Sequence, residues 1–375
     1  MTGMNGVFPM AHRLADHLVD LDNPNPFPGL LALERKTGRR VQLRLGGNES
    51  LDAPLTSLRQ LYGDAFCHLA RLYGDPSGER LRERLAQCGG FDPNELCIDS
   101  GADAVIALCV RALCSPGDTA VTSAGTYPTF GYFARASGCH LIEVPYEDHD
   151  GILSVSPDTL LATARRARAK VIYLANPDNP TGSWLPLERI EALAAQLPDD
   201  CTLLLDEAYL EFCPALAAGS ERSIPGCIRI RSLSKAHALA GLRIGYALAE
   251  KNLLDGLAKA RIHYSVGGLA QHAAQLALAD ADHAEAIRTH NALLRETLSE
   301  RLRAAGYRVL PSGTNFVSLL LPTEEDARQL QEQLLASQVA VHRPQHPSLN
   351  NLIRVTLCEA ALQEWLLDIF LRARR

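Results

Sequence analysis

Short runs of apolar residues alternate along this chain with longer segments in which apolar residues recur every three or four positions. The apolar runs include VIYLA at 171–175, TLLLD at 202–206 and IRIRS at 228–232. Such runs are typical of buried strands, whereas the segments between them have the spacing of amphipathic helices. Helices are expected near residues 78–88, 102–114, 128–137, 157–168 and 186–196. This alternation predicts an α/β fold with a mostly parallel sheet covered on both faces.

The pattern changes after about residue 250. A long helical region at about 251–306 is rich in Ala, Leu, Gln and Arg. It is followed by YRVLPSGTNFVSLLL, a helix at 324–336 and the apolar segment NLIRVTL. This order predicts a smaller α+β unit near the C-terminal end, and the sequence contains no internal repeat or low-complexity tract.

Composition and charge narrow the range of functions. The 375 residues are 47% hydrophobic and 21% charged, with a formal net charge of −6, which argues against a surface for nucleic acid or anionic membranes. No apolar run has the length of a membrane span, and the N-terminus lacks the pattern of a signal peptide. The ten cysteines are scattered without a C-x-x-C pair, so we expect free thiols in a reducing cytoplasm and no metal site.

Polar side chains follow three of the predicted strands at the point where each strand ends. They are Asn176 and Asn179 after the first strand, Asp206 after the second, and Ser232, Ser234 and Lys235 after the third. In a parallel sheet the carboxyl ends of the strands meet at one edge, where ligands bind. The sequence therefore predicts that these three segments form one site.

Lys235 differs from the four other lysines of the chain by its neighbours. A single lysine is usually a surface charge, but a lysine in a partly buried cleft can act as a nucleophile toward carbonyl groups. Ser232 and Ser234 can donate hydrogen bonds to a phosphate, and Arg243 offers a planar fork that matches one. The SGADA turn at 100–104 adds backbone N–H groups at a helix N-terminus, where an anion is favoured.

Asp206 and its neighbours suit a cationic aromatic ring. A carboxylate at a strand end often only caps a turn, but Asp206 could also pair with a protonated ring nitrogen. Tyr209 and Asn179 could then bond a ring oxygen, and the prolines around Asn179 fix its turn. Phe130 could stack on the ring face or simply pack in the core. A phosphate, a basic ring nitrogen, a ring hydroxyl and an aldehyde for a lysine together describe pyridoxal phosphate.

Three motifs occur in a characteristic order: NPDNPTG at 176–182, LLDEAYLEF at 204–212 and SLSKAHALAGLRIGY at 232–246. With them, the chain from about residue 48 to 354 resembles the class I and II aminotransferases of fold type I, and most closely their histidinol-phosphate aminotransferase branch. The resemblance implies a large pyridoxal-phosphate-binding domain at 50–255 and a smaller domain formed by 1–49 and 256–375. It also implies a homodimer with shared active sites.

The resemblance assigns a role to each candidate residue. Lys235 would form a Schiff base with the cofactor and then move a proton, Asp206 would pair with the pyridine nitrogen, and Tyr209 and Asn179 would bond the ring oxygen. Phe130 would stack on the ring. The phosphate would be bound by the backbone of Ala102 and Asp103, by Ser232, Ser234 and Arg243, and by Tyr73 of the neighbouring subunit. Arg354 would bind the carboxylate or phosphate of the substrate, with Asn48 beside it.

The departures from the family pattern lie mostly around the substrate. GGNES lacks the usual first asparagine, LYGD at 72–75 lacks an arginine, and His263 stands where proline is common. They leave the amino donor and the 2-oxo acid acceptor open. A decarboxylase, cyclase or oxidase reaction on the same scaffold is an alternative. A pyridoxal-phosphate-binding regulator is disfavoured, because the segment before the core is too short for a DNA-binding domain and the charge is acidic.

Overall fold

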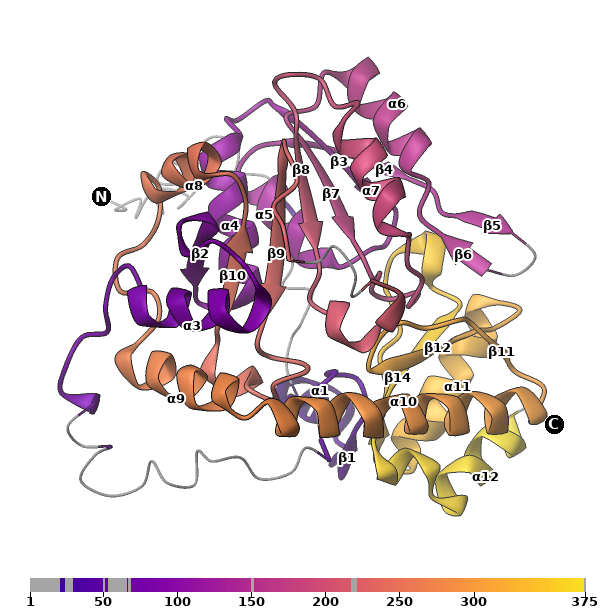
Figure 1. The fold of residues 1–375 in the computed structure, drawn as a ribbon. Helices are drawn as coiled ribbons and strands as arrows, with labels where there is room; N and C mark the ends of the chain where they lie inside the picture. Colours follow the sequence, from indigo (N-terminus) through magenta and orange to yellow (C-terminus); the bar gives the residue numbers. More distant parts are fainter. Residues whose placement is uncertain are drawn as a thin grey trace, which may run out of the picture.

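The computed structural model describes residues 21–23, 30–49, 51–52, 66, 69–149, 152–216 and 221–373. Within them, the largest sheet has seven strands in the order β2-β10-β9-β8-β7-β3-β4 (Figure 1). The strands are β2 (Leu96–Asp99), β3 (Thr119–Ser123), β4 (His140–Val144), β7 (Val171–Ala175), β8 (Thr202–Asp206), β9 (Cys227–Ser232) and β10 (Gly245–Leu248). The predicted α/β architecture is therefore present.

The strands of this sheet share one direction apart from β10. The pairs β3–β4, β3–β7, β7–β8 and β8–β9 are parallel, whereas β10 is antiparallel to both β9 and β2. The carboxyl ends of β7, β8 and β9 therefore lie side by side. The polar residues that follow these strands meet there, as the sequence predicts.

Helices cover both faces of the sheet. On one face α4 (Gly101–Leu113), α5 (Pro128–Ala136) and α8 (Lys251–Ala258) enclose one apolar core, and on the other α6 (Pro157–Ala167) and α7 (Leu187–Ala194) enclose a second. A hairpin of β5 (Glu147–His149) and β6 (Ile152–Ser154) projects beyond α6 (Figure 1). None of the described helices is long and apolar enough to cross a membrane.

A second, smaller unit has its own core. Its elements are β1 (Leu43–Arg44), α10 (Ala281–Ala304), β11 (Arg308–Val309), β12 (Phe316–Leu320), α11 (Glu324–Ala336), β13 (Val339–Ala340), β14 (Leu352–Thr356) and α12 (Glu364–Ala373). Strands β11, β12 and β14 form one sheet, and β1 pairs with β13. Leu45 is buried in the core of this unit, so the segment after α1 (Leu30–Thr37) joins the C-terminal part of the chain. We call residues 43–49 and 281–373 the small unit.

The predicted boundary between the two domains, at residue 255, stays a prediction. Beyond it in the chain, α9 (Gly268–Ala279) packs against α3 (Glu79–Gly89) beside β2 and β10. Val266, Ala274 and Ala277 share one apolar cluster with Leu81 and Ile98. We therefore call residues 69–279 the large unit. Apolar spacing predicts the helix, but it does not reveal which core the helix covers.

Candidate active site

A cavity of about 610 Å³ lies at the carboxyl ends of β7, β8 and β9, where the small unit meets the large one. Except for Phe130 and Tyr73, the predicted site residues all line it: Asn48, Ala102, Asp103, Asn179, Asp206, Tyr209, Ser232, Ser234, Lys235, Arg243 and Arg354. These residues come from segments as far apart as 48 and 354, so only the fold brings them together.

One end of the cavity is built from closely approaching backbones. Gly101 begins α4 with a φ of +82°, and a Cβ added at Gly245 would lie 2.4 Å from the carbonyl carbon of Gly101 and 2.5 Å from the nitrogen of Ala102. Only a glycine at position 245 therefore lets β10 approach the start of this helix so closely. Arg243 lies at the same end, 3.4 Å from the carboxylate of Asp103. Backbone N–H groups, hydroxyls and a guanidinium here fit a phosphate.

The carboxyl group of Asp206 lies on the floor of the cavity at the end of β8, with 5% of the residue exposed. Its oxygens accept hydrogen bonds from the hydroxyl of Tyr173, at 2.7 Å, and from the backbone N–H of Ala208, at 3.0 Å. Burial raises the pKa of Asp206 to about 6, against the effect of these two bonds. A cationic partner in the cavity would reverse this rise, so the group fits a protonated ring nitrogen.

Tyr209, Asn48 and Lys235 form a connected polar group. The hydroxyl of Tyr209 accepts hydrogen bonds from the side-chain amides of Asn48, at 2.9 Å, and Asn179, at 3.5 Å. The ammonium of Lys235 donates to the backbone carbonyl of Asn48, at 3.2 Å, and lies 5.8 Å from the centre of the Tyr209 ring. The small unit therefore contacts the lysine directly through Asn48.

Arg354 brings a buried guanidinium from β14 to the cavity, and only 3% of the residue is exposed. It donates hydrogen bonds to the side-chain oxygen of Asn179 and, at 2.8 Å, to the carbonyl of Gly46. Its Nε is buried without a hydrogen-bond partner. Because a buried cation is costly unless it is paired, an anion in the cavity would stabilise this side chain.

Phe130 does not lie where the resemblance places it. The residue belongs to α5 and is fully buried in the core between α4, α5 and the sheet, and its ring stacks on that of Tyr173 with centroids 4.7 Å apart and planes inclined by 7°. The aromatic residue that lines the cavity in this segment is Tyr127, whose hydroxyl donates to Asp103 at 2.8 Å. Tyr127 immediately precedes Pro128, which begins α5. That helix start is the sequence signal that would have identified it.

Tyr73 also lies outside the cavity of its own chain. It is 87% exposed, and its ring contacts that of Tyr264, with the centroids 4.9 Å apart. Leu72 and Ile262 are exposed nearby in the sequence, at 71% and 64%. These four residues are large and apolar or aromatic, and each of them is exposed in the single chain.

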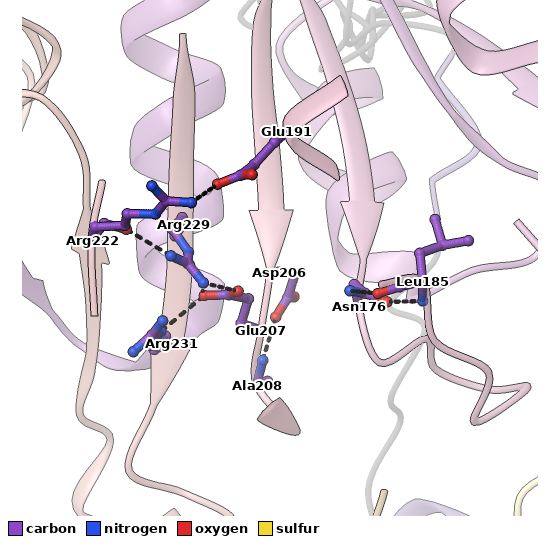
Figure 2. Close-up of polar contacts among 9 residues, drawn as sticks. All are labelled: Asn176, Leu185, Glu191, Asp206, Glu207, Ala208, Arg222, Arg229 and Arg231. Atoms are coloured by element: carbon purple, nitrogen blue, oxygen red, sulfur yellow. Dashed lines mark hydrogen bonds and ion pairs between the residues drawn. The ribbon is translucent and has the colours of Figure 1, made fainter. Parts of the chain in front are cut away.

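A buried charge cluster lies behind Asp206, and sequence reasoning did not find it. Glu207 accepts hydrogen bonds from Arg229, at 2.6 and 3.0 Å, and from Arg231, at 2.9 Å (Figure 2). Burial raises the pKa of Glu207, but the guanidiniums of Arg229 and Arg231 lower it by more, so the pKa lies below its usual value. Glu207 is therefore an ionised carboxylate that forms ion pairs with two arginines, directly after Asp206 in the chain.

The comparison with protein families agrees with this geometry. Residues 40–373 match the family model described as aminotransferase class I and II. The chain belongs to that family. The predicted family, fold type and enzyme class are thereby confirmed. No group of His, Cys, Asp and Glu in the described part of the chain could hold a metal ion.

Individual relatives point to one branch of the family. The chain is 32% identical over 352 residues to the histidinol-phosphate aminotransferase of Rhodospirillum rubrum, an alignment that covers 89% of this chain and 92% of the relative. The crystal structure of histidinol-phosphate aminotransferase from Sinorhizobium meliloti, in complex with pyridoxal 5′-phosphate, superposes with a TM-score of 0.85 at 34% identity and covers 96% of both chains. The predicted resemblance to this branch is confirmed.

Proposed function

We propose that this protein is a pyridoxal-phosphate-dependent aminotransferase that moves an amino group from an amino acid to a 2-oxo acid. The observation that supports it best is that Lys235, the buried carboxyl of Asp206 and the start of α4 at Ala102 and Asp103, which suits a phosphate, share one cavity. When bound, pyridoxal phosphate supplies an aldehyde for an amine and a protonated ring that withdraws electrons from the bonded carbon.

The residues of the large unit would hold the cofactor. The backbone N–H groups of Ala102 and Asp103, with Ser232, Ser234 and Arg243, would bind the phosphate. Asp206 would keep a proton on the ring nitrogen, and Tyr209 and Asn179 would bond the ring oxygen. Tyr127 replaces Phe130 as the aromatic residue available for the ring face, because it lines the cavity.

Lys235 would anchor the cofactor and serve as the base. An incoming amino acid would free the Nζ of Lys235 from the cofactor. This Nζ could then accept the proton from the substrate carbon and pass it to the neighbouring carbon of the cofactor. In the structure this amine is placed by its hydrogen bond to the carbonyl of Asn48, at 3.2 Å. Since Asn48 belongs to the small unit, the position of the base depends on the packing of the two units.

Arg354 and Asn48 would bind the substrate. The unpartnered Nε of Arg354 can donate to a carboxylate or a phosphate, and the guanidinium is already held by Asn179 and Gly46. Relatives named histidinol-phosphate aminotransferase make histidinol phosphate the first amino donor to test. A panel of aromatic and other amino acids would follow, each scored by the loss of the absorbance of the lysine-bound cofactor.

Chemical trapping tests the role of Lys235. Reduction with borohydride followed by digestion and mass spectrometry should place the cofactor-derived label on the peptide that contains Lys235. The variant Lys235→Ala should take up no label at that peptide. A label on another lysine would refute the assignment. A different reaction on this scaffold would be indicated if none of the amino donors converts the cofactor to its amine form.

We further propose a cytoplasmic homodimer in which Tyr73 of one chain completes the site of the other. Tyr73 lies outside the cavity of its own chain but is highly exposed beside Tyr264, and nine cysteines in the described part of the chain are free. Sedimentation should give twice the mass of the chain. Mixing Tyr73→Phe chains with Lys235→Ala chains should restore some activity, and a mixture that stays inactive would refute the shared site.

A further inference from the structure

Tyr173 and Asp206 are buried neighbours in the large sheet. The two residues lie on neighbouring parallel strands, with Ala175 of β7 opposite Asp206 of β8. Residues two apart on a strand share a face, so Tyr173 and Asp206 point the same way on the sheet. The hydroxyl of Tyr173 lies 2.7 Å from Oδ2 of Asp206.

The surroundings of Tyr173 leave its hydroxyl one role. The residue is fully buried in the core, and its ring stacks on that of Phe130. Burial raises the pKa of Tyr173 well above its usual value, and the charge of Asp206 raises it further. The phenol therefore keeps its proton and donates it in the hydrogen bond. Among the residues that the structure describes, the only acceptor for this hydroxyl is the carboxyl group of Asp206.

We propose that Tyr173 is a positioning residue for the cofactor, holding Asp206 ionised and aimed at the ring nitrogen, while Phe130 keeps Tyr173 in place. This inference rests on the proposed function, since it assumes that a protonated ring nitrogen binds Asp206. Phe130 would then support the site indirectly, by stacking on Tyr173 behind the residues that line the cavity, and would not stack on the cofactor itself.

The charges around Asp206 show why such a donor is needed. Asp103 on α4 and Glu207, the next residue in the chain, both disfavour the ionised form of Asp206, as does burial. The hydrogen bonds from Tyr173 and from the N–H of Ala208 favour it. Removing the bond from Tyr173 therefore shifts a proton shared by Asp206 and the ring nitrogen toward the carboxyl group.

The test removes the hydroxyl with Tyr173→Phe and measures binding of pyridoxal phosphate to the cofactor-free chain. A hydrogen bond to a charged group is worth about 1.5 kcal/mol, so the dissociation constant should rise about tenfold. With cofactor labelled at the ring nitrogen, the ¹⁵N signal should move toward the unprotonated position. An unchanged dissociation constant and signal would overturn the proposal.

A double-mutant cycle separates positioning from simple packing. If Tyr173 acts through Asp206, Tyr173→Phe should have little effect on cofactor affinity in an Asp206→Asn background. A tenfold loss that persists in that background would show a structural role and overturn the inference. Tyr307→Phe is the matched control, because its buried hydroxyl donates to the carbonyl of Phe370 in the small unit. It should leave the affinity unchanged.

A second variant decides the question if Tyr173→Phe does not fold. Phe130→Leu keeps the hydroxyl of Tyr173 but removes the ring on which Tyr173 stacks. We expect cofactor affinity to fall about threefold, with the ¹⁵N signal shifted in the same direction; an unmoved signal would overturn the inference. Failure of the proposed function looks different, because the wild-type chain would then either bind no pyridoxal phosphate or bind it without any amino donor converting it to its amine form.

Discussion

Arg354 donates a hydrogen bond to the side-chain oxygen of Asn179, although 175 positions separate the two residues. The arginine belongs to β14 of the small unit, and the asparagine belongs to the turn that follows β7 of the large unit. The proposed substrate-binding group is therefore tied to a proposed cofactor-binding group. The Nε of Arg354 is buried and has no hydrogen-bond partner among the described residues.

This geometry predicts the effect of Arg354→Lys. A lysine has one ammonium, which cannot bond Asn179, Gly46 and a substrate anion together in the geometry of a guanidinium. We expect kcat/KM for the amino donor to fall about 100-fold, a loss of about 3 kcal/mol, with cofactor affinity close to that of the wild type. Arg328→Lys, in an exposed ion pair on α11, should change neither quantity. Equal losses in both would contradict the assignment to substrate.

Asp206 should make the stability of the cofactor-free chain fall as the pH rises. Its pKa in the folded chain is raised to about 6, so the folded state holds a proton that the unfolded state has already lost. Stability from this group is present below about pH 4 and is lost as the pH rises through 6, by about 3 kcal/mol. Asp206→Asn mimics the protonated form and should be the more stable chain at pH 7.

Urea unfolding of both cofactor-free chains at pH 4 and pH 7 checks this prediction. The difference in unfolding free energy between variant and wild type should grow with pH. Adding pyridoxal phosphate should reverse the order at pH 7, because the variant lacks the charge that pairs with the ring nitrogen. A difference that stays constant with pH would show that Asp206 is not the group responsible.

Glu207→Gln should be among the most destabilising single changes near the site. It leaves Arg229 and Arg231 buried without their common carboxylate, and breaking such a pair costs about 3–5 kcal/mol. The measurement is the midpoint and slope of urea unfolding. Glu191→Gln is the control, since Glu191 pairs with Arg222 at a more exposed position of the same region (Figure 2). That variant should stay within about 0.5 kcal/mol of the wild type.

Gly245→Ala should damage the phosphate end of the cavity. The added methyl group would lie 2.4 Å from the backbone of Gly101, so the start of α4 must move. Overpacking of this kind costs about 1–3 kcal/mol, and we expect cofactor affinity to fall at least about tenfold. Gly256→Ala on α8 is the matched control, because a Cβ there meets nothing within 4 Å. It should raise stability by about 0.5–1 kcal/mol and leave cofactor affinity unchanged.

The sequence predicts most of this site because the site is built at strand ends. Asn179, Asp206 and Lys235 each follow an apolar run, and the register of parallel strands brings such positions together whatever the details of packing. The helices of the large unit are predicted equally well. Most of their observed ends lie within two residues of the expected ones. Local pattern and topology suffice for these features.

Features that depend on side-chain packing could not be predicted in this way. Arg229 and Arg231 alternate with apolar residues like the exposed side of a strand, yet both are buried, because Glu207 lies on the same face. Phe130 and Tyr127 are three positions apart, and only the start of α5 decides which one reaches the cavity. Likewise, the sequence does not reveal that α9 packs against α3, because this contact depends on which apolar surface the other elements leave uncovered.

The segment 233–244 begins and ends at the same point of the large sheet, because β9 and β10 are antiparallel neighbours with Ser232 opposite Gly245. Lys235 and Arg243 are thus both carried by the large unit, whereas Arg354 is carried by the small unit and donates a hydrogen bond to Asn179 of the large unit. The phosphate of the cofactor would be bound within one unit, but the anion of the substrate would be bound across the boundary between the two. Substrate binding would therefore act as an added link between the units.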